Sequence, residues 1–173
     1  MSTHTLRWLP SGREVQIWLQ ELPGENMTEV EGEPLKFPAG VLWPERTAAL
    51  SQWFPLNANR YGLLGGTFVP HREEVFHLYL PVPVVDTLSS YEPPYRRPGL
   101  PDEFRAAVVG GVAHNLAALP RGSLYLRAAA HDIVGSSPAA FKTLGMSLMN
   151  LLALPVWDEA VTGPSGWFVS PLG

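Results

Sequence analysis

The spacing of hydrophobic positions first indicates two helices in the last third of the chain. Across residues 101–119, apolar side chains recur every three or four positions, which places them on one face of a helix. This face comprises Phe104, Ala107, Val108, Val112, Leu116 and Leu119. A second stripe predicts a helix that begins with Ser137 as N-cap and Pro138 in its first turn, and that stops before Pro155. Its expected buried face comprises Phe141, Leu144, Gly145, Leu148, Met149 and Leu152.

Period-two alternation predicts strands in the rest of the chain. In residues 14–21, Val15, Ile17 and Leu19 alternate with polar or aromatic side chains, as expected of a half-buried strand. The other expected strands are residues 5–9, 61–69, 74–82 and 123–128. Residues 44–54 are expected to form a short helix instead, because proline suits a first helical turn. Residues 81–99 are a proline-rich loop of a length that is usually functional or disordered.

Composition narrows the class of protein. Charged residues make up 16% of the chain, against a usual share of about 25%, so we expect an oligomer or a partner-binding face. The net charge of −4 argues against a broad basic nucleic-acid footprint but leaves room for a local arginine patch. With no cysteine, disulfides and thiolate metal sites are excluded. We find no secretory leader pattern and no apolar run of about 18 residues, and therefore expect a cytoplasmic protein without membrane contact.

Two clusters of polar residues invite a chemical interpretation. His71, Glu73, Glu74 and His77 are metal-ligand types, but their spacing matches no zinc pattern, so we expect a solvated turn and neither a metal nor a cofactor. The pair His131-Asp132, with serines a few residues later, lacks the glycine-flanked nucleophile elbow of a hydrolase. A small-molecule enzyme that uses this pair in a pocket remains an alternative.

A set of basic residues could bind phosphate. Arginines of the loop and of the strand region could gather into an anion-binding patch, with Tyr91 and Tyr95 as stacking surfaces. The alternative is that these arginines are simply solvated. The candidate phosphate-binding residues, completed by the resemblance described next, are Arg96, Arg97, Arg121, Arg127 and Lys142.

Two motifs, in the same order, resemble domain IV of translation elongation factor G. Residues 101–111 follow that domain's pattern of proline, glutamate, aromatic, alanine-valine and glycine. Residues 131–142 resemble its histidine-acid pair followed by two serines and alanine-phenylalanine-lysine, with Val134-Gly135 where the family has one aspartate. The resemblance covers residues 99–152. It implies a two-layer α+β sandwich with about four strands and two main helices on one face.

The resemblance also implies a function and the residues that would carry it. In the family this domain reaches into the decoding site of the ribosome through a tip loop that carries the matched histidine. The corresponding binding residues here are His131, Asp132, Gly135, Ser136 and Ser137. No GTPase signature is present, so we expect no GTP to be bound.

These observations combine into one expectation with two alternatives. We expect residues 1–58 to form a β-rich extension with a short helix, residues 59–155 the domain-IV-like core, and residues 156–173 a tail. The function expected is that of a non-catalytic, translation-related protein that docks on the ribosome or on structured RNA through the His131 tip. The alternatives are a protein-interaction or assembly module that lacks RNA binding, with a second copy of the chain or another protein as partner, and the small-molecule enzyme.

Overall fold

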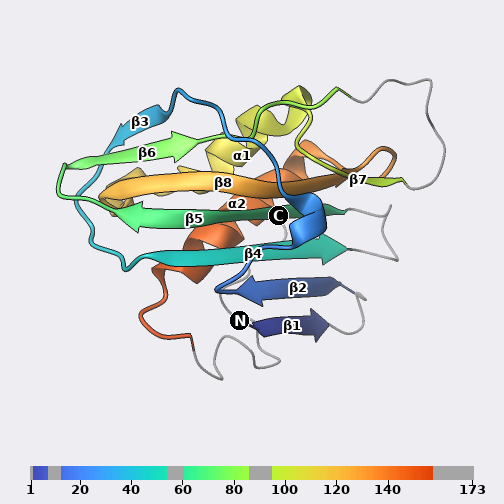
Figure 1. Ribbon diagram of the computed structural model, residues 1–173, viewed down its shortest axis with the longest axis horizontal. Coiled ribbons are helices and arrows are strands. Elements are labelled where there is room, and N and C mark those ends of the chain that lie inside the picture. The colour runs from blue at the N-terminus through green and yellow to red at the C-terminus, as the bar shows by residue number, and fades with distance from the viewer. Residues whose placement is uncertain (1, 8–12, 54–60, 86–94, 158–173) are drawn as a thin grey trace.

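The computed structural model describes residues 2–7, 13–53, 61–85 and 95–157 (Figure 1). Within these ranges the chain forms one mixed eight-stranded sheet and two α-helices. The strands are β1 (Ser2–Arg7), β2 (Glu14–Leu19), β3 (Leu35–Pro38), β4 (Arg46–Trp53), β5 (Gly62–Pro70), β6 (Val75–Tyr79), β7 (Arg96–Pro98) and β8 (Gly122–Asp132). The helices are α1 (Arg105–Val112) and α2 (Pro138–Ala153), with short 3-10 turns at Gly24–Asn26, Asp102–Phe104 and Leu116–Ala118.

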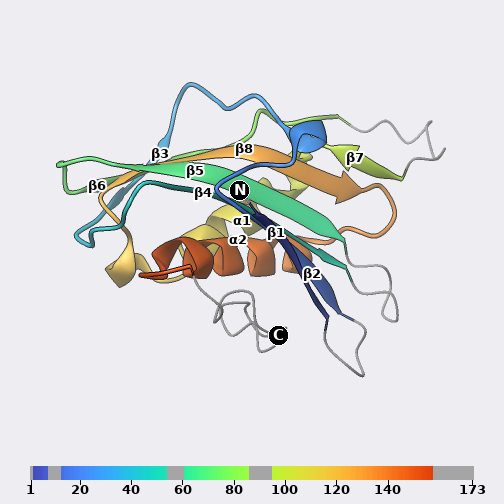
Figure 2. The same ribbon diagram turned by 60° about the horizontal axis from the view of Figure 1, so that its bottom comes forward.

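The strands follow the order β1-β2-β4-β5-β8-β6-β3, and β7 also pairs with β8. Every pairing is antiparallel except that of β6 with β8. Both helices cover one face of the sheet, and α2 packs against β4 and β5 (Figure 2). The molecule therefore has a helical layer, a sheet, and a second sheet face without helices, which we call the open face.

The expected sheet of about four strands is wrong, because the sheet has eight. The additional strands come mainly from the first 58 residues, which supply β1, β2, β3 and β4 to the same sheet.

The expected helix at residues 44–54 is also wrong, since β4 occupies this stretch. Leu50 of β4 faces the helices and Ala49 the other side, and both are buried. Burial on both faces removes the alternation that marks a strand. The division of the chain at residues 58 and 155 stays a prediction.

The first expected helix is shorter than its hydrophobic pattern. α1 ends at Val112, and the His114 ring nitrogen Nδ1 donates a hydrogen bond to the carbonyl of Gly111 over 2.9 Å. Leu116, expected on the buried face, is 62% exposed. Two adjacent glycines weaken this helix near its end, so the hydrophobic spacing beyond them belongs to a turn.

The second expected helix is confirmed in its start and in its buried face. The Ser137 hydroxyl accepts a hydrogen bond from the Ala140 amide over 3.2 Å, and Pro138 begins the helix. All six residues of the expected face are buried. β4 holds both ends of α2, because Gln52 donates to the Ala140 carbonyl over 3.1 Å and Arg46 donates to the carbonyls of Leu152, Leu154 and Pro155.

A bulge in β8 changes which residues face the helices. Gly65 of β5 pairs with Ala128 and Thr67 pairs with Tyr125, so β8 has one extra residue at this point. Before the bulge, Leu126 packs in the main core under the helices. After the bulge, Ala129 packs there, while Ala128 belongs to a second apolar cluster. The bulge thus reverses the alternation within one strand.

The segment that joins β2 to β3 crosses the open face (Figures 1 and 2). We call residues 20–34 the strap. Met27 forms a bridge with Ala128, and the Thr28 amide donates to the Arg127 carbonyl over 2.7 Å. The apolar residues beneath this end of the open face are Tyr61, Leu63, Ala128 and Ala130, with Trp18, Leu22 and Trp53 packed against them. The strap therefore leaves the part of the open face nearer β6 uncovered.

Within the described ranges, no helix combines the length and the apolarity that crossing a membrane requires.

Two neighbouring glycines of α1 give a matched test of helix packing. A Cβ added at Gly111 would collide with the Lys142 carbonyl of α2, whereas one added at Gly110 meets nothing within 4 Å. Gly111→Ala should lower the free energy of unfolding by about 1–3 kcal/mol through overpacking. Gly110→Ala should raise it by about 0.5–1 kcal/mol, because alanine suits a helix better than glycine. Urea denaturation of both variants measures the difference, and equal effects would contradict the close helix crossing.

Candidate functional site

The structure places His131 inside the protein. It lies near the end of β8, its side chain is 2% exposed, and its Nδ1–H donates to the Gly99 carbonyl over 2.8 Å. A partner that approaches the turn after β8 therefore does not meet the imidazole. The exposed side chain of this turn is Val134, at 68%.

The other four expected tip residues have bonds within the fold. The Asp132 carboxylate accepts hydrogen bonds from the amides of Val134 and Gly135, both over 2.8 Å. The Ser136 hydroxyl donates to the Tyr61 carbonyl over 2.7 Å and accepts from the Asp132 amide over 2.8 Å. The Gly135 carbonyl accepts from the Tyr61 amide over 3.0 Å, and Ser137 caps α2. This arrangement is typical of a turn stabilised by its own side chains.

The structure separates the five expected phosphate-binding residues. Arg96 and Arg97 lie on β7, next to the end of β8, and Arg96 stacks on Tyr61 at 4.1 Å from the ring centroid. Arg121 pairs with Glu74 over 2.9 Å beyond the opposite end of β8. Lys142 is exposed on α2, on the helical side. Only Arg127 lies on the uncovered part of the open face. Of the expected stacking residues, Tyr95 is exposed and Tyr91 lies outside the described residues.

The open face instead brings two tyrosines, which the sequence did not single out, together with Arg127 and two histidines. Tyr79 of β6 and Tyr125 of β8 are register partners, and their rings stack with centroids 4.6 Å apart and planes 12° apart. The Arg127 guanidinium lies 5.0 Å from the Tyr125 centroid. His77 lies edge-on to Tyr79 at 6.4 Å, and His71 lies 5.4 Å from His77. We call these five residues the aromatic ladder.

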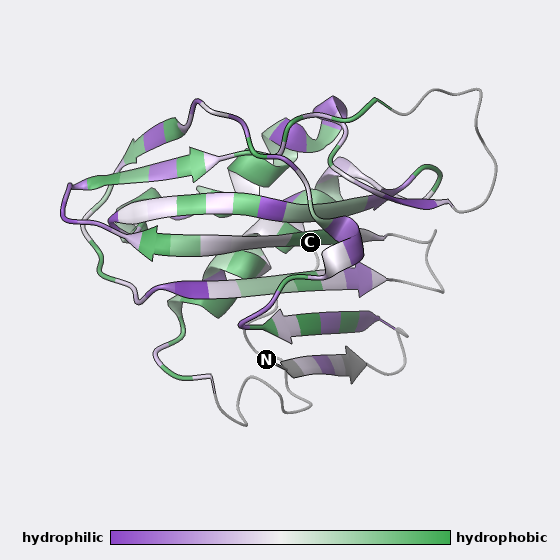
Figure 3. Ribbon diagram, in the orientation of Figure 1, coloured by the Kyte–Doolittle hydropathy of each residue, from purple (hydrophilic) through white to green (hydrophobic). Residues whose placement is uncertain are grey.

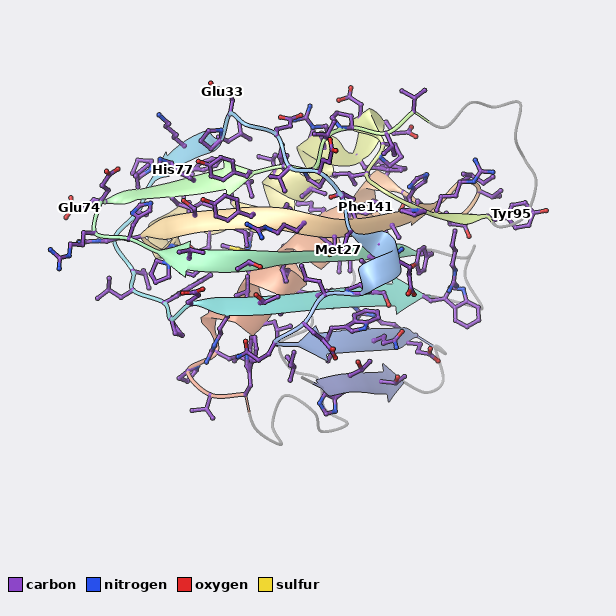
Figure 4. The ribbon with its side chains drawn as sticks, in the orientation of Figure 1. Met27, Glu33, Glu74, His77, Tyr95 and Phe141 are labelled. Atoms are coloured by element: carbon purple, nitrogen blue, oxygen red, sulfur yellow. The ribbon has the colours of Figure 1, made fainter. Side chains whose placement is uncertain are left out.

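Alternation within β6 and β8 gives the ladder its direction. Phe76 and Leu78 are fully buried under the helices, so His77 and Tyr79 point to the open face. Figure 3 shows the same alternation of hydrophilic and hydrophobic positions along β6, and Figure 4 shows His77 on that strand. The alternation of residues 74–82 did predict that His77 and Tyr79 share a face. No sequence signal placed Tyr125 beside them, since the strands are far apart in the chain.

The electrostatic environment of the ladder is basic near His77. Burial lowers the pKa of His77 below its ordinary value, and the positive charges of His71 and Lys36 lower it further, while Glu73 raises it. Lys36 is the register partner of His77 on β3. Among the described residues, no carboxylate forms an ion pair with Arg127. The uncovered part of the open face therefore joins aromatic rings to cationic groups.

Comparison with known proteins adds no identity: no family model, no curated protein and no solved structure matches the chain. The resemblance to elongation factor G domain IV therefore stays a prediction.

The burial of His131 yields a prediction about stability. His131→Ala leaves the buried Gly99 carbonyl without its donor and should lower the free energy of unfolding by about 1–3 kcal/mol. Val134→Ala, at the exposed end of the same turn, should change it by less than about 0.5 kcal/mol. Urea denaturation monitored by tryptophan fluorescence provides the measurement. A neutral His131→Ala variant would contradict the buried hydrogen bond.

Proposed function

We propose that this protein is a non-catalytic, cytoplasmic RNA-binding protein that docks on unpaired bases of a structured RNA, such as those of the ribosome, through the open face of its sheet. The observation that carries the proposal is the stacked pair Tyr79 and Tyr125 with Arg127 beside it. The contact surface is therefore the sheet face, in place of the turn at His131.

Aromatic rings on a sheet face suit unpaired bases. Several RNA-binding modules hold splayed bases against aromatic side chains of an open sheet, and each stacking contact contributes about 1–3 kcal/mol. Tyr79 and Tyr125 are half-buried on two adjacent strands, β6 and β8, each of which has a neighbouring strand on both sides that fixes its position. A base that stacks there meets rings that lose little side-chain entropy on binding.

Arg127 adds to the two tyrosine rings a positive charge that can pair with phosphate. Guanidinium groups both stack on aromatic rings and pair with phosphate oxygens in a two-pronged geometry. Arg127 is exposed and already lies against Tyr125, so a phosphate next to a base stacked there is within reach of it. Contacts of this kind position a nucleic-acid backbone without reading its sequence.

The net negative charge of the chain determines how RNA affinity should depend on salt. A net charge of −4 provides no long-range attraction for RNA, so affinity has to come from stacking and from a few local cations. Binding should therefore depend less steeply on salt than it does for proteins that contact many phosphates. This supports single-stranded or looped segments, which offer base faces, over the uniform backbone of a duplex.

The stacking contact can be tested with one aromatic residue. In Tyr125→Leu the side chain stays apolar but loses its ring, and affinity for a fluorescent single-stranded RNA of about twelve nucleotides should fall about 5- to 100-fold. Tyr125→Phe keeps the ring and should bind like the parent protein. Fluorescence anisotropy at fixed salt gives the dissociation constants, and urea denaturation confirms that both variants fold.

Two control variants locate the contact. Lys142→Ala on the helical layer and Val134→Ala at the turn should leave RNA affinity unchanged. If Val134→Ala alone lost RNA binding, the contact surface would be the turn after β8 and not the sheet face. No binding of the RNA, together with no cosedimentation with ribosomes at low salt, would overturn the proposal.

A groove beside the strap supports a second candidate, a protein-interaction module. Its volume is about 290 Å³. Met27 and Val82 line it and are 47% and 39% exposed. Exposed apolar side chains around a groove suit a protein partner. Met27→Glu should abolish such an interaction, seen as loss of self-association or of a copurified protein, and should leave RNA affinity unchanged. A monomer with no copurified protein would exclude this candidate.

A further inference from the structure

Four polar side chains meet at the β6 end of the open face. His77 lies between Lys36, its register partner on β3, and Ser123, its register partner on β8. The Ser123 hydroxyl lies 3.5 Å from His77 Nδ1, and the His71 ring lies 5.4 Å from the His77 ring. Three strands and one turn thus bring one amine, two imidazoles and one hydroxyl together.

The hydrogen-bonding capacity of this cluster is only partly used. Neither ring nitrogen of His71 has a hydrogen-bond partner among the described residues, although both nitrogens are shielded from solvent. Buried polar atoms normally have partners. Rotation of the His71 side chain in its turn would direct one nitrogen to an anion held between His71 and His77.

We propose that Lys36, His71, His77 and Ser123 form a phosphate subsite of the open face, which takes a backbone phosphate of the RNA. Protonated imidazole, ammonium and hydroxyl groups are all donors, and together they match the acceptor oxygens of a phosphate. The subsite rests on the RNA-binding function proposed above and extends it. It lies next to Tyr79, so one nucleotide spans the ring and the subsite.

The neighbouring charges leave the subsite cationic. Glu73 acts on His77 from the turn and favours its protonated form. Glu74 pairs with Arg121 over 2.9 Å, which neutralises both groups. Other ionisable groups on the adjoining elements are Arg72 in the turn, Tyr79 on β6, and Tyr125 and Arg127 on β8. One acidic side chain therefore faces two imidazoles and one ammonium group.

The arrangement fixes the sign of the pH dependence. The pKa of His77 in the free protein lies below its ordinary value, so the imidazole is mostly neutral at pH 7. A phosphate binds the protonated form more tightly and raises this pKa. Affinity therefore increases as pH falls from the higher pKa of the complex to the lower pKa of the free protein, and the increase is complete below the latter.

The experiment measures RNA affinity by anisotropy with the full chain at pH 8.0 and at pH 5.5. The parent protein should bind roughly tenfold more tightly at pH 5.5. In His77→Asn and in the double variant His71→Asn/His77→Asn, the ratio of the affinity at pH 5.5 to that at pH 8.0 should fall close to one. His114→Asn, which alters an exposed histidine on the helical side, should keep the full gain and serves as the matched control.

A titration with inorganic phosphate decides the inference without RNA. Imidazole NMR signals of His77 should shift on addition of phosphate at pH 5.5, whereas those of His114 should not, and the pKa of His77 should rise. RNA binding that depends on Tyr125 but not on pH or on His77 would overturn the subsite and leave the proposed function intact. Absence of RNA binding at both pH values would overturn the proposed function, and the phosphate titration would then decide the subsite alone.

Discussion

The fold depends on the pairing of β8, because this strand joins β1, β2, β4 and β5 on one side of the sheet to β6 and β3 on the other. It pairs with β5 on one side and with β6 and β7 on the other. Its bulge opposite Gly66 lets one strand place Leu126 and then Ala129 under the helices. A Cβ at Gly66 would collide with the Tyr125 carbonyl, so the bulge requires glycine at this position. Without the bulge, His131 would point to the open face.

The two faces of the sheet have different physical roles as a result. On the helical face, β4 binds α2 at both ends, through Gln52 at its start and Arg46 at its end. A cation at the end of a helix also interacts favourably with the helix dipole. On the open face, half-buried rings and cations take the place of a second helical layer. A closely packed core thus supports a sheet face on which rings and cations stand without a covering helix.

Local signals in the sequence predicted the local structure well. Ser137 and Pro138 marked the start of α2, and the alternation of Val15, Ile17 and Leu19 marked β2. The sequence patterns predicted the wrong structure where tertiary packing determines it. β4 is buried on both faces, so its residues do not alternate between apolar and polar. α1 ends after two glycines, although the apolar spacing continues beyond them. The aromatic residues of the open face were missed for a related reason. His131 and its neighbours are polar, but the turn uses them itself, whereas Tyr79 and Tyr125 meet only when β6 pairs with β8.

The strap has a consequence for the order in which the chain acquires its structure. Met27 pairs with Ala128, which follows most of the sheet in the sequence. β1, β2 and β4 can pair with one another soon after synthesis, but the strap has no surface to cross until β8 is in place. Long-range contacts of this kind form slowly, because loop closure costs entropy before it is repaid. The first third of the chain is therefore synthesised first, but it reaches its final structure only after β8 has been synthesised and has joined the sheet.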